Sequence, residues 1–143
     1  MASAATHDLA DRLHSSAIHL LRRLRREDDA SGLPAPQLSA LSVIVFAGPV
    51  TLGELAQAEQ VRPPTITRLV DKLESAGLVD RVSDPSDRRI SRVAATPKGV
   101  KLLHDGRRRR VASLAASLRD LPEKERAALA KAVPILEKVV RAN

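Results

Sequence analysis

The apolar positions near the N-terminus recur every three or four residues, as in one stripe of a long amphipathic helix. They are Leu9, Leu13, Ala17, Leu20 and Leu24. A charged stretch and then Gly32 and Pro34 end this pattern. The sequence "PAPQLSALSVIVFAGPV" follows, and it predicts a second helix that is very apolar at its end and is closed by Gly48-Pro49.

The stretch "VTLGELAQAEQ" carries the marks of a helix start. Thr51 is followed three residues later by Glu54, which predicts a capping box in which each side chain accepts the other residue's free backbone N–H. Val50, just before the cap, can pack on Leu55 as a hydrophobic staple. We therefore expect a short helix that runs to about Glu59.

The next segment, "VRPPTITRLVDKLESAGL", predicts a helix with two distinct faces. Pro63 lies at or near its first position, where a missing N–H costs nothing. At 100° per residue one arc is apolar (Ile66, Leu69, Val70, Leu73) and the other is polar (Pro64, Thr67, Arg68, Asp71, Lys72, Ser75). Gly77 is expected to end the helix as a left-handed cap, with Leu78 folding back onto Leu73.

A β-hairpin and two more helices complete the predicted order. "LVDRVS" and "RISRVA" alternate in polarity around the turn sequence "DPSD". Thr96-Pro97 caps and starts a helix, and Pro122 starts the last one. Pro134 lies inside that last helix, so we expect it to kink or break the helix there.

Two short helices joined by a tight turn form a helix-turn-helix, and a hairpin directly after it makes a winged helix. The predicted fold class is therefore mainly α with a small β-hairpin wing. We expect one domain over residues 1–143, with a winged helix-turn-helix lobe over 36–96 and long flanking helices over 1–30 and 97–143. The second helix of the motif, about Pro63 to Ala76, is called the recognition helix below, and the hairpin is called the wing.

Composition narrows the possible partners. The chain of 143 residues has 43% apolar residues, a single Phe and no Trp or Tyr, so its core must be aliphatic. The net charge of +7 and the pI of about 10.7 favour a polyanion or an anionic membrane surface as partner. The absence of cysteine excludes disulfides and zinc–thiolate sites. We see no signal peptide and no apolar run of membrane-spanning length, and expect a cytoplasmic protein.

Placed on DNA, a winged helix puts its polar helix in the major groove and its hairpin tip near the minor groove. Arg88 and Arg89 at that tip are therefore candidate minor-groove probes, and Asp87 is expected to fix the wing without touching DNA. The candidate contacts on and next to the recognition helix are Arg62, Pro64, Thr65, Thr67, Arg68 and Lys72. Lys72 lies further along the helix, so we assign it to a phosphate rather than a base.

Other chemistries find little support in the sequence. The four histidines (His7, His14, His19, His104) include no pair at the i, i+4 spacing of a helical metal site, so we predict neither a metal nor a cofactor. No Gly-rich phosphate loop and no Ser beside a plausible base is present, so we do not expect an enzyme. The arginine run at 107–110 goes all round a helix, and we interpret it as a solvated face.

The motifs "ELA", "TITRLVDKLESAGLVDR", "DPSDRR" and "TPKG" together resemble the MarR family of bacterial transcription regulators, over nearly the whole chain. The resemblance implies a homodimer built on the first and last two helices, a palindromic operator, usually repression, and often release by a small, frequently phenolic, ligand. It implies that Arg89 is the wing-tip arginine and that Arg68 faces the groove. The interface residues it implies are Leu9, Leu13, Leu20, Leu118, Leu129, Leu136 and Val140.

The sequence departs from the family pattern in three places. "RPP" replaces the usual Ser or Thr cap of the recognition helix, Ala95 replaces a larger aliphatic residue, and Pro134 with the arginine run changes the dimer helices. The scarcity of aromatic residues also argues against an aromatic-lined ligand pocket. Two other functions stay open: a basic nucleoid-type DNA binder with little sequence preference, and a winged helix used as a protein-interaction module.

Overall fold

The computed structural model describes residues 1 and 3–142, which form six α-helices, one 3-10 helix and three short strands. The elements in chain order are α1 (Ala4–Arg25), η1 (Arg26–Ser31), α2 (Ala35–Ala47), β1 (Val50–Thr51), α3 (Leu52–Glu59), α4 (Pro63–Ser75), β2 (Val79–Ser83), β3 (Ser91–Ala95), α5 (Pro97–Arg119) and α6 (Glu123–Arg141). This confirms the predicted fold class.

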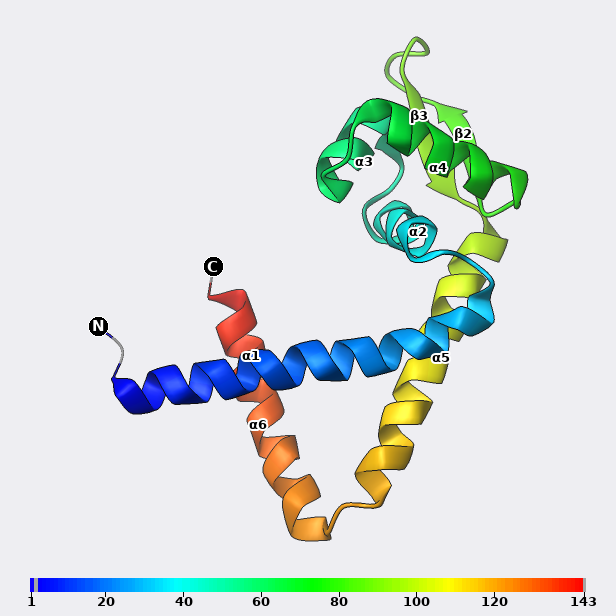
Figure 1. The fold of residues 1–143 in the computed structure, drawn as a ribbon. Coiled ribbons are helices and arrows are strands. Elements are labelled where there is room, and N and C mark those ends of the chain that lie inside the picture. The colour runs from blue at the N-terminus through cyan, green and yellow to red at the C-terminus, as the bar shows by residue number, and fades with distance from the viewer. Residues whose placement is uncertain (2, 143) are drawn as a thin grey trace.

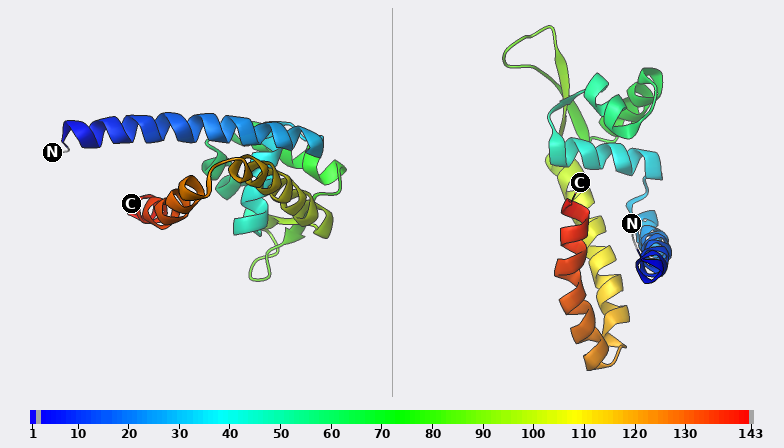
Figure 2. Two further views of the ribbon diagram at one scale, coloured as in Figure 1. Left: turned by 90° about the horizontal axis from the view of Figure 1, so that it is seen from below. Right: turned by 90° about the vertical axis from the view of Figure 1, so that its left-hand side faces the viewer.

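The elements separate into a compact lobe and a frame of long helices (Figure 1). The lobe holds α2, α3, α4 and the strands, and the β2–β3 loop projects from it. Helix α5 leads away from the lobe, α6 turns back at its far end, and α1 runs across both (Figures 1 and 2). The N-terminal end of α1 and the C-terminal end of α6 both lie on the left in Figure 1, and the α5–α6 turn is the part of the frame farthest from the wing.

The buried core lies almost wholly within the lobe. Its apolar members are Ala40, Leu41, Ile44, Val50, Leu55, Ala56, Ile66, Val70, Leu73, Leu78, Val79 and Val93. All of them are aliphatic, as the composition predicts, and the one aromatic residue, Phe46, is 72% exposed. The apolar arc predicted for α4 is the arc that packs into this core, which leaves the polar arc facing outward.

The local signals at both ends of the helix-turn-helix are confirmed. The Thr51 hydroxyl accepts from the Glu54 N–H at 3.1 Å and the Glu54 carboxylate accepts from the Thr51 N–H at 3.0 Å, which completes the capping box. At the end of α4, Gly77 has φ of +72°. The Leu78 N–H donates to the Leu73 carbonyl at 2.9 Å, the wrapped geometry that a left-handed glycine permits.

The hairpin is confirmed as an antiparallel pair, in which Val79 lies opposite Ala95 and Ser83 opposite Ser91. The sheet also has a third strand that we did not predict. Val50 and Thr51 pair with Val93 and Arg92, so β3 lies in the middle. A two-residue strand has no room for an alternating pattern, and Thr51 carries the stronger signal of a helix cap.

The lobe is joined to α5 by a tightly packed corner. The Thr96 side chain caps α5 by accepting from the Gly99 N–H at 3.1 Å, as predicted. Lys98 donates from Nζ to the Ala76 carbonyl at 2.8 Å, at the end of α4. A β-carbon on Gly99 would lie 2.2 Å from the Leu78 carbonyl oxygen, so only glycine allows this approach. The start of α5 is thereby held against the end of the recognition helix.

The arginine run at 107–110 is not a wholly solvated face, and this corrects our interpretation. Arg107 and Arg108 are exposed, but Arg109 and Arg110 face η1. Arg109 donates to the Glu27 carbonyl at 3.3 Å and Arg110 forms an ion pair with Asp28. Helix α5 and η1 pack against each other, a tertiary contact that the helical pattern of either segment alone does not reveal.

Pro134 does not break the last helix, because α6 continues from Glu123 to Arg141 as one helix. Of the predicted kink or break, the break is therefore wrong. Proline removes the N–H that would bond the Ala130 carbonyl. Ala130 and Pro134 are both exposed, so water can satisfy that carbonyl in place of the missing donor.

Helices α1 and α6 bury none of their described residues within one chain. Among the described residues α6 makes no extensive contact with another element. By length and composition, no single described helix could cross a membrane, and only α1–η1 taken together with α2, bent by 90°, passes that test. The apolar stripes of α1 and α6 are therefore not buried within the single chain and remain open to solvent.

Candidate nucleic-acid interface

The recognition helix presents a continuous polar surface. Pro64, Thr65, Thr67, Arg68 and Lys72 are all exposed, whereas the opposite side of α4 is buried. Among the described residues, the Arg68 side chain makes no hydrogen bond or ion pair within the chain. It therefore stands as an uncompensated cation at the middle of this surface.

The first turn of α4 differs from a usual helix start. Arg62 occupies the N-cap position and supplies no side-chain cap, as the "RPP" sequence predicts. Proline at the first two positions removes two donors that would otherwise need partners. The Thr67 hydroxyl donates to the Pro63 carbonyl at 3.0 Å. In this geometry the outer side of that hydroxyl offers a ligand only its acceptor lone pairs.

The turn of the wing is built around one buried carboxylate. Asp84 is 5% exposed and accepts from the Ser86 N–H at 2.8 Å and the Asp87 N–H at 3.3 Å. It also accepts from the Ser86 hydroxyl and pairs with the Arg92 guanidinium. Hydrogen bonds from Ser86, then from Arg92, hold the pKa of the Asp84 carboxyl well below its usual range. The carboxylate therefore stays ionised, and keeps these bonds, at a lower pH than an ordinary aspartate would.

The wing tip holds one arginine in a fixed, outward position. The Arg89 guanidinium donates to both carboxylate oxygens of Asp87, at 3.1 and 3.0 Å, and the Arg89 N–H also donates to Asp87 at 3.0 Å. The Arg89 side chain is nevertheless 91% exposed. The side-chain bond from Arg89 is the main cause that lowers the pKa of Asp87. Arg88 is exposed beside it.

A second ion-pair group joins the recognition helix to the wing. Arg81 of β2 pairs with Asp71 of α4 at 2.7 Å and also with Glu74, one turn further along. The side chain of Arg81 is 31% exposed, against 57% for Asp71 and 40% for Glu74. Both acidic side chains of α4 are therefore paired with a cation of the sheet.

The sequence did not reveal the ion pairs of Arg81 and Arg92, or that Asp84 is buried. A signal for Arg81 was available: it follows the buried Val79 by two positions, and alternate residues of a strand share a face. No such signal existed for Arg92, which pairs with both Asp84 and Glu54, the second at 3.4 Å. That contact links the wing to the start of α3 and depends on how β3 meets β1.

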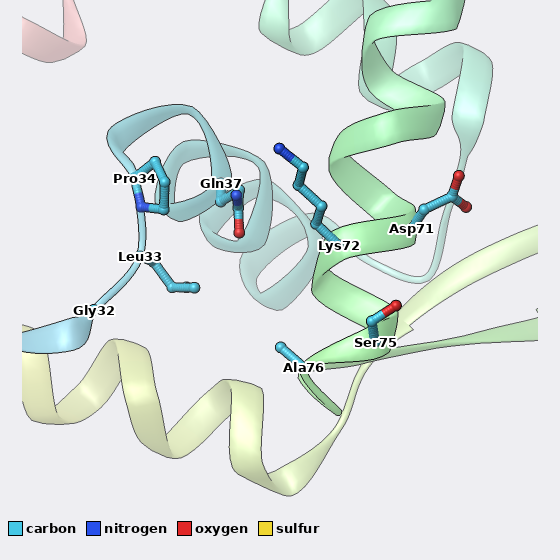
Figure 3. Close-up of a pocket in the computed structure, with 8 residues that line it drawn as sticks. All are labelled: Gly32, Leu33, Pro34, Gln37, Asp71, Lys72, Ser75 and Ala76. Atoms are coloured by element: carbon cyan, nitrogen blue, oxygen red, sulfur yellow. The ribbon is translucent and has the colours of Figure 1, made fainter.

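An open groove of about 560 Å³ lies beside the recognition helix. Its lining residues are Gly32, Leu33, Pro34, Gln37, Asp71, Lys72, Ser75 and Ala76. Lys72 extends from α4 toward α2, where the Gln37 amide faces it (Figure 3). Gln37 is only 8% exposed, and among the described residues its amide has no hydrogen-bond partner. The groove therefore combines an apolar edge with unpaired polar groups and contains no aromatic side chain.

A tight helix-turn-helix with a β-hairpin at its side, both carrying exposed arginines, defines a winged helix-turn-helix protein. A model of the MarR family matches residues 33–91. An uncharacterised HTH-type transcriptional regulator of Mycobacterium bovis is 37% identical over 128 residues, covering 90% of each chain. The chain belongs to the MarR family of transcriptional regulators, which are DNA-binding proteins and not enzymes.

Solved structures agree with this assignment. A transcriptional regulator of Thermotoga maritima superposes with a TM-score of 0.85 at 26% identity, covering 96% of each chain. A mutant of MepR from S. aureus, solved with a bound oligodeoxyribonucleotide, superposes with a TM-score of 0.70 at 20% identity, over 94% of this chain and 98% of that one. At 20% identity, the similarity to MepR shows that the two proteins share a fold.

Proposed function

We propose that this protein is a homodimer that binds a palindromic DNA operator with sequence specificity and represses transcription there. The observation that carries the proposal is the pair of exposed guanidinium groups: Arg68 on the recognition helix and Arg89 held by Asp87 at the wing tip. The two lie on the two elements that a winged helix places in adjacent grooves. The DNA-bound MepR structure has the same fold and supports this use of it.

In this proposal the recognition helix enters the major groove. Arg68 reads a base edge, for which the commonest arginine partner is guanine. Thr65, Thr67 and Pro64 contact bases or the sugar-phosphate chain near the start of the helix. Arg62 and Lys72 bind phosphates at its two ends. The wing arginines, Arg88 and Arg89, enter the neighbouring minor groove, where a narrow A·T-rich segment has enhanced negative potential.

The uncovered apolar stripes of the long helices support the dimer. Leu9, Leu13 and Leu20 on α1, with Leu129, Leu136 and Val140 on α6, are between 38% and 78% exposed in the single chain, and Leu118 on α5 is half-buried. An exposed apolar surface of this extent marks an interaction site. A second copy of the chain covers it and sets two recognition helices about one DNA turn apart. Such a dimer acts in the cytoplasm, at the nucleoid.

Selection of duplexes from a random library by the purified protein, followed by titration of the selected duplex with excess random competitor, tests this function. We expect a palindromic consensus and a complex that survives competitor. A complex that every competitor removes equally identifies a nucleoid-type binder instead. No binding even at low salt leaves the protein-interaction module as the function, because phosphate contacts strengthen as salt falls.

Replacing Arg89 with alanine is expected to weaken binding most on operators with A·T-rich flanks. The narrow minor groove of such flanks attracts arginine more strongly. Titration of two duplexes that differ only in the flanks measures the effect, and we expect a loss of about tenfold per half-site on the A·T-rich one, in the range of one good arginine contact. Asp84→Asn disturbs the turn of the wing but keeps Arg89. Titrating it on the same two duplexes therefore separates the effect of losing the turn from the effect of losing Arg89. Equal losses on both duplexes would rule out the minor-groove role.

The groove beside α4 is the proposed site for a ligand that releases the protein from DNA. The Lys72 ammonium and the Gln37 amide suit a small organic anion with an aliphatic body, and its binding removes Lys72 from its phosphate. Titration of small carboxylic acids into the protein–operator complex, followed by fluorescence anisotropy, measures release. We expect Gln37→Leu to bind the operator like the wild type but to resist release, because Gln37 faces the ligand and not the DNA. Release that this substitution leaves unchanged would place the ligand elsewhere.

A further inference from the structure

Arg81 lies on β2, outside the recognition helix, yet it binds two side chains of that helix. Its guanidinium binds Asp71 at 2.7 Å and also Glu74. Asp71 follows Arg68 by three positions on the same exposed face of α4. Residues three apart on a helix are neighbours, and an aspartate there can pair with an arginine. Asp71 therefore has two possible arginine partners, and the structure shows it bound to Arg81.

We propose that Arg81 is a positioning residue for DNA recognition: by binding Asp71, it prevents Asp71 from pairing with Arg68 and so keeps the Arg68 guanidinium free for a base. The inference rests on the proposed function, because it concerns how Arg68 becomes available to DNA. It also explains how the recognition helix can carry an acidic residue, Asp71, one turn from Arg68, the arginine proposed to contact a base. Figure 3 shows the Asp71 side chain leaving α4 on a different side from Lys72.

The alternative role of Arg81, as a structural brace between α4 and the wing, fits the geometry less well. Asp71 and Glu74 are 57% and 40% exposed, and ion pairs between exposed groups contribute little to stability. Competition for Arg68 needs no strong pair. It needs only that the Asp71 carboxylate, three residues from Arg68, has a better partner. The Arg81 guanidinium, which binds both Asp71 and Glu74, is such a partner.

The test compares variants on the operator selected by the wild-type protein, at about 0.1 M salt, where exposed charges act over about 10 Å. Arg81→Gln is expected to bind about twofold more weakly per half-site, as the pairing of Arg68 with an exposed aspartate three residues away predicts, and to lose part of its discrimination at the base pair that Arg68→Ala affects. Adding Asp71→Asn should restore both affinity and specificity. Adding Glu74→Gln changes the charge equally but should restore neither, because Glu74 lies six positions from Arg68.

Each other outcome overturns the inference. Equal rescue by both second substitutions would mean that only net charge matters, and rescue by neither would mean that Arg81 contacts DNA or braces the wing. Arg81→Gln with wild-type binding would also refute it. Asp71→Asn alone leaves Arg81 intact and should bind at least as tightly as the wild type, whereas weaker binding would identify a brace. If the wild-type protein selects no duplex, the proposed function fails first and the inference fails with it.

Discussion

Replacing Leu136 with glutamate is expected to convert the protein to a monomer and to weaken operator binding by at least about a hundredfold, the lower range of what linking two binding modules adds. Leu136 lies on the apolar side of α6, in line with Leu129 and Val140. A carboxylate there would be buried without a partner at the interface between two copies. The two recognition helices would then bind their half-sites independently.

Sedimentation measures the assembly, and anisotropy on the selected operator measures the affinity. Ala127→Glu is the matched control, since Ala127 lies on the opposite side of the same exposed helix and receives the same charge. We expect that variant to stay dimeric. A Leu136→Glu protein that remains a dimer would show that α6 does not form the interface, and loss of dimer with unchanged affinity would show that one recognition helix is enough.

The elements with strong local signals were predictable. Thr51 and Glu54 bond each other's backbone N–H at the start of α3. Pro63 has no N–H that needs a partner at the start of α4, and Gly77 allows the left-handed turn that ends it. In each case the sequence alone contains the cause. The hairpin was predictable for the same reason, because "DPSD" makes its own hydrogen bonds. Pro134 shows the limit of such rules, since its effect on α6 depends on how exposed the freed carbonyl is.

The contacts that orient the candidate site depend on tertiary structure. Arg81 and Asp71 are ten positions apart, and Arg92 and Glu54 are thirty-eight positions apart. Neither pair has a spacing that any helix or strand period would bring together. The sequence therefore identified which side chains of the recognition helix are exposed, whereas only the structure shows which cations are already paired with carboxylates and which, like Arg68, have no partner among the described residues.

Replacing Arg68 with alanine is expected to cost about 1–3 kcal/mol per half-site and to relax specificity at one base position, as the loss of a bidentate arginine–base contact does. Arg68 has no partner among the described residues, so its removal leaves no unpaired carboxylate behind. A set of operators with single base changes, each titrated with both proteins, measures the effect. The wild type should discriminate strongly at one position where the variant does not.

Lys72→Ala is the informative comparison, because a phosphate contact carries no base information. It should weaken binding to every duplex alike and reduce the salt slope by about one per half-site, or about two for the dimer. Arg68→Ala should leave discrimination at the other positions intact. Because a palindrome is read by both protomers, a change in both half-sites should cost about twice the free energy of a change in one. A loss of equal size on every duplex would assign Arg68 to a phosphate, and the recognition helix would then read its operator through Thr65 and Thr67 instead.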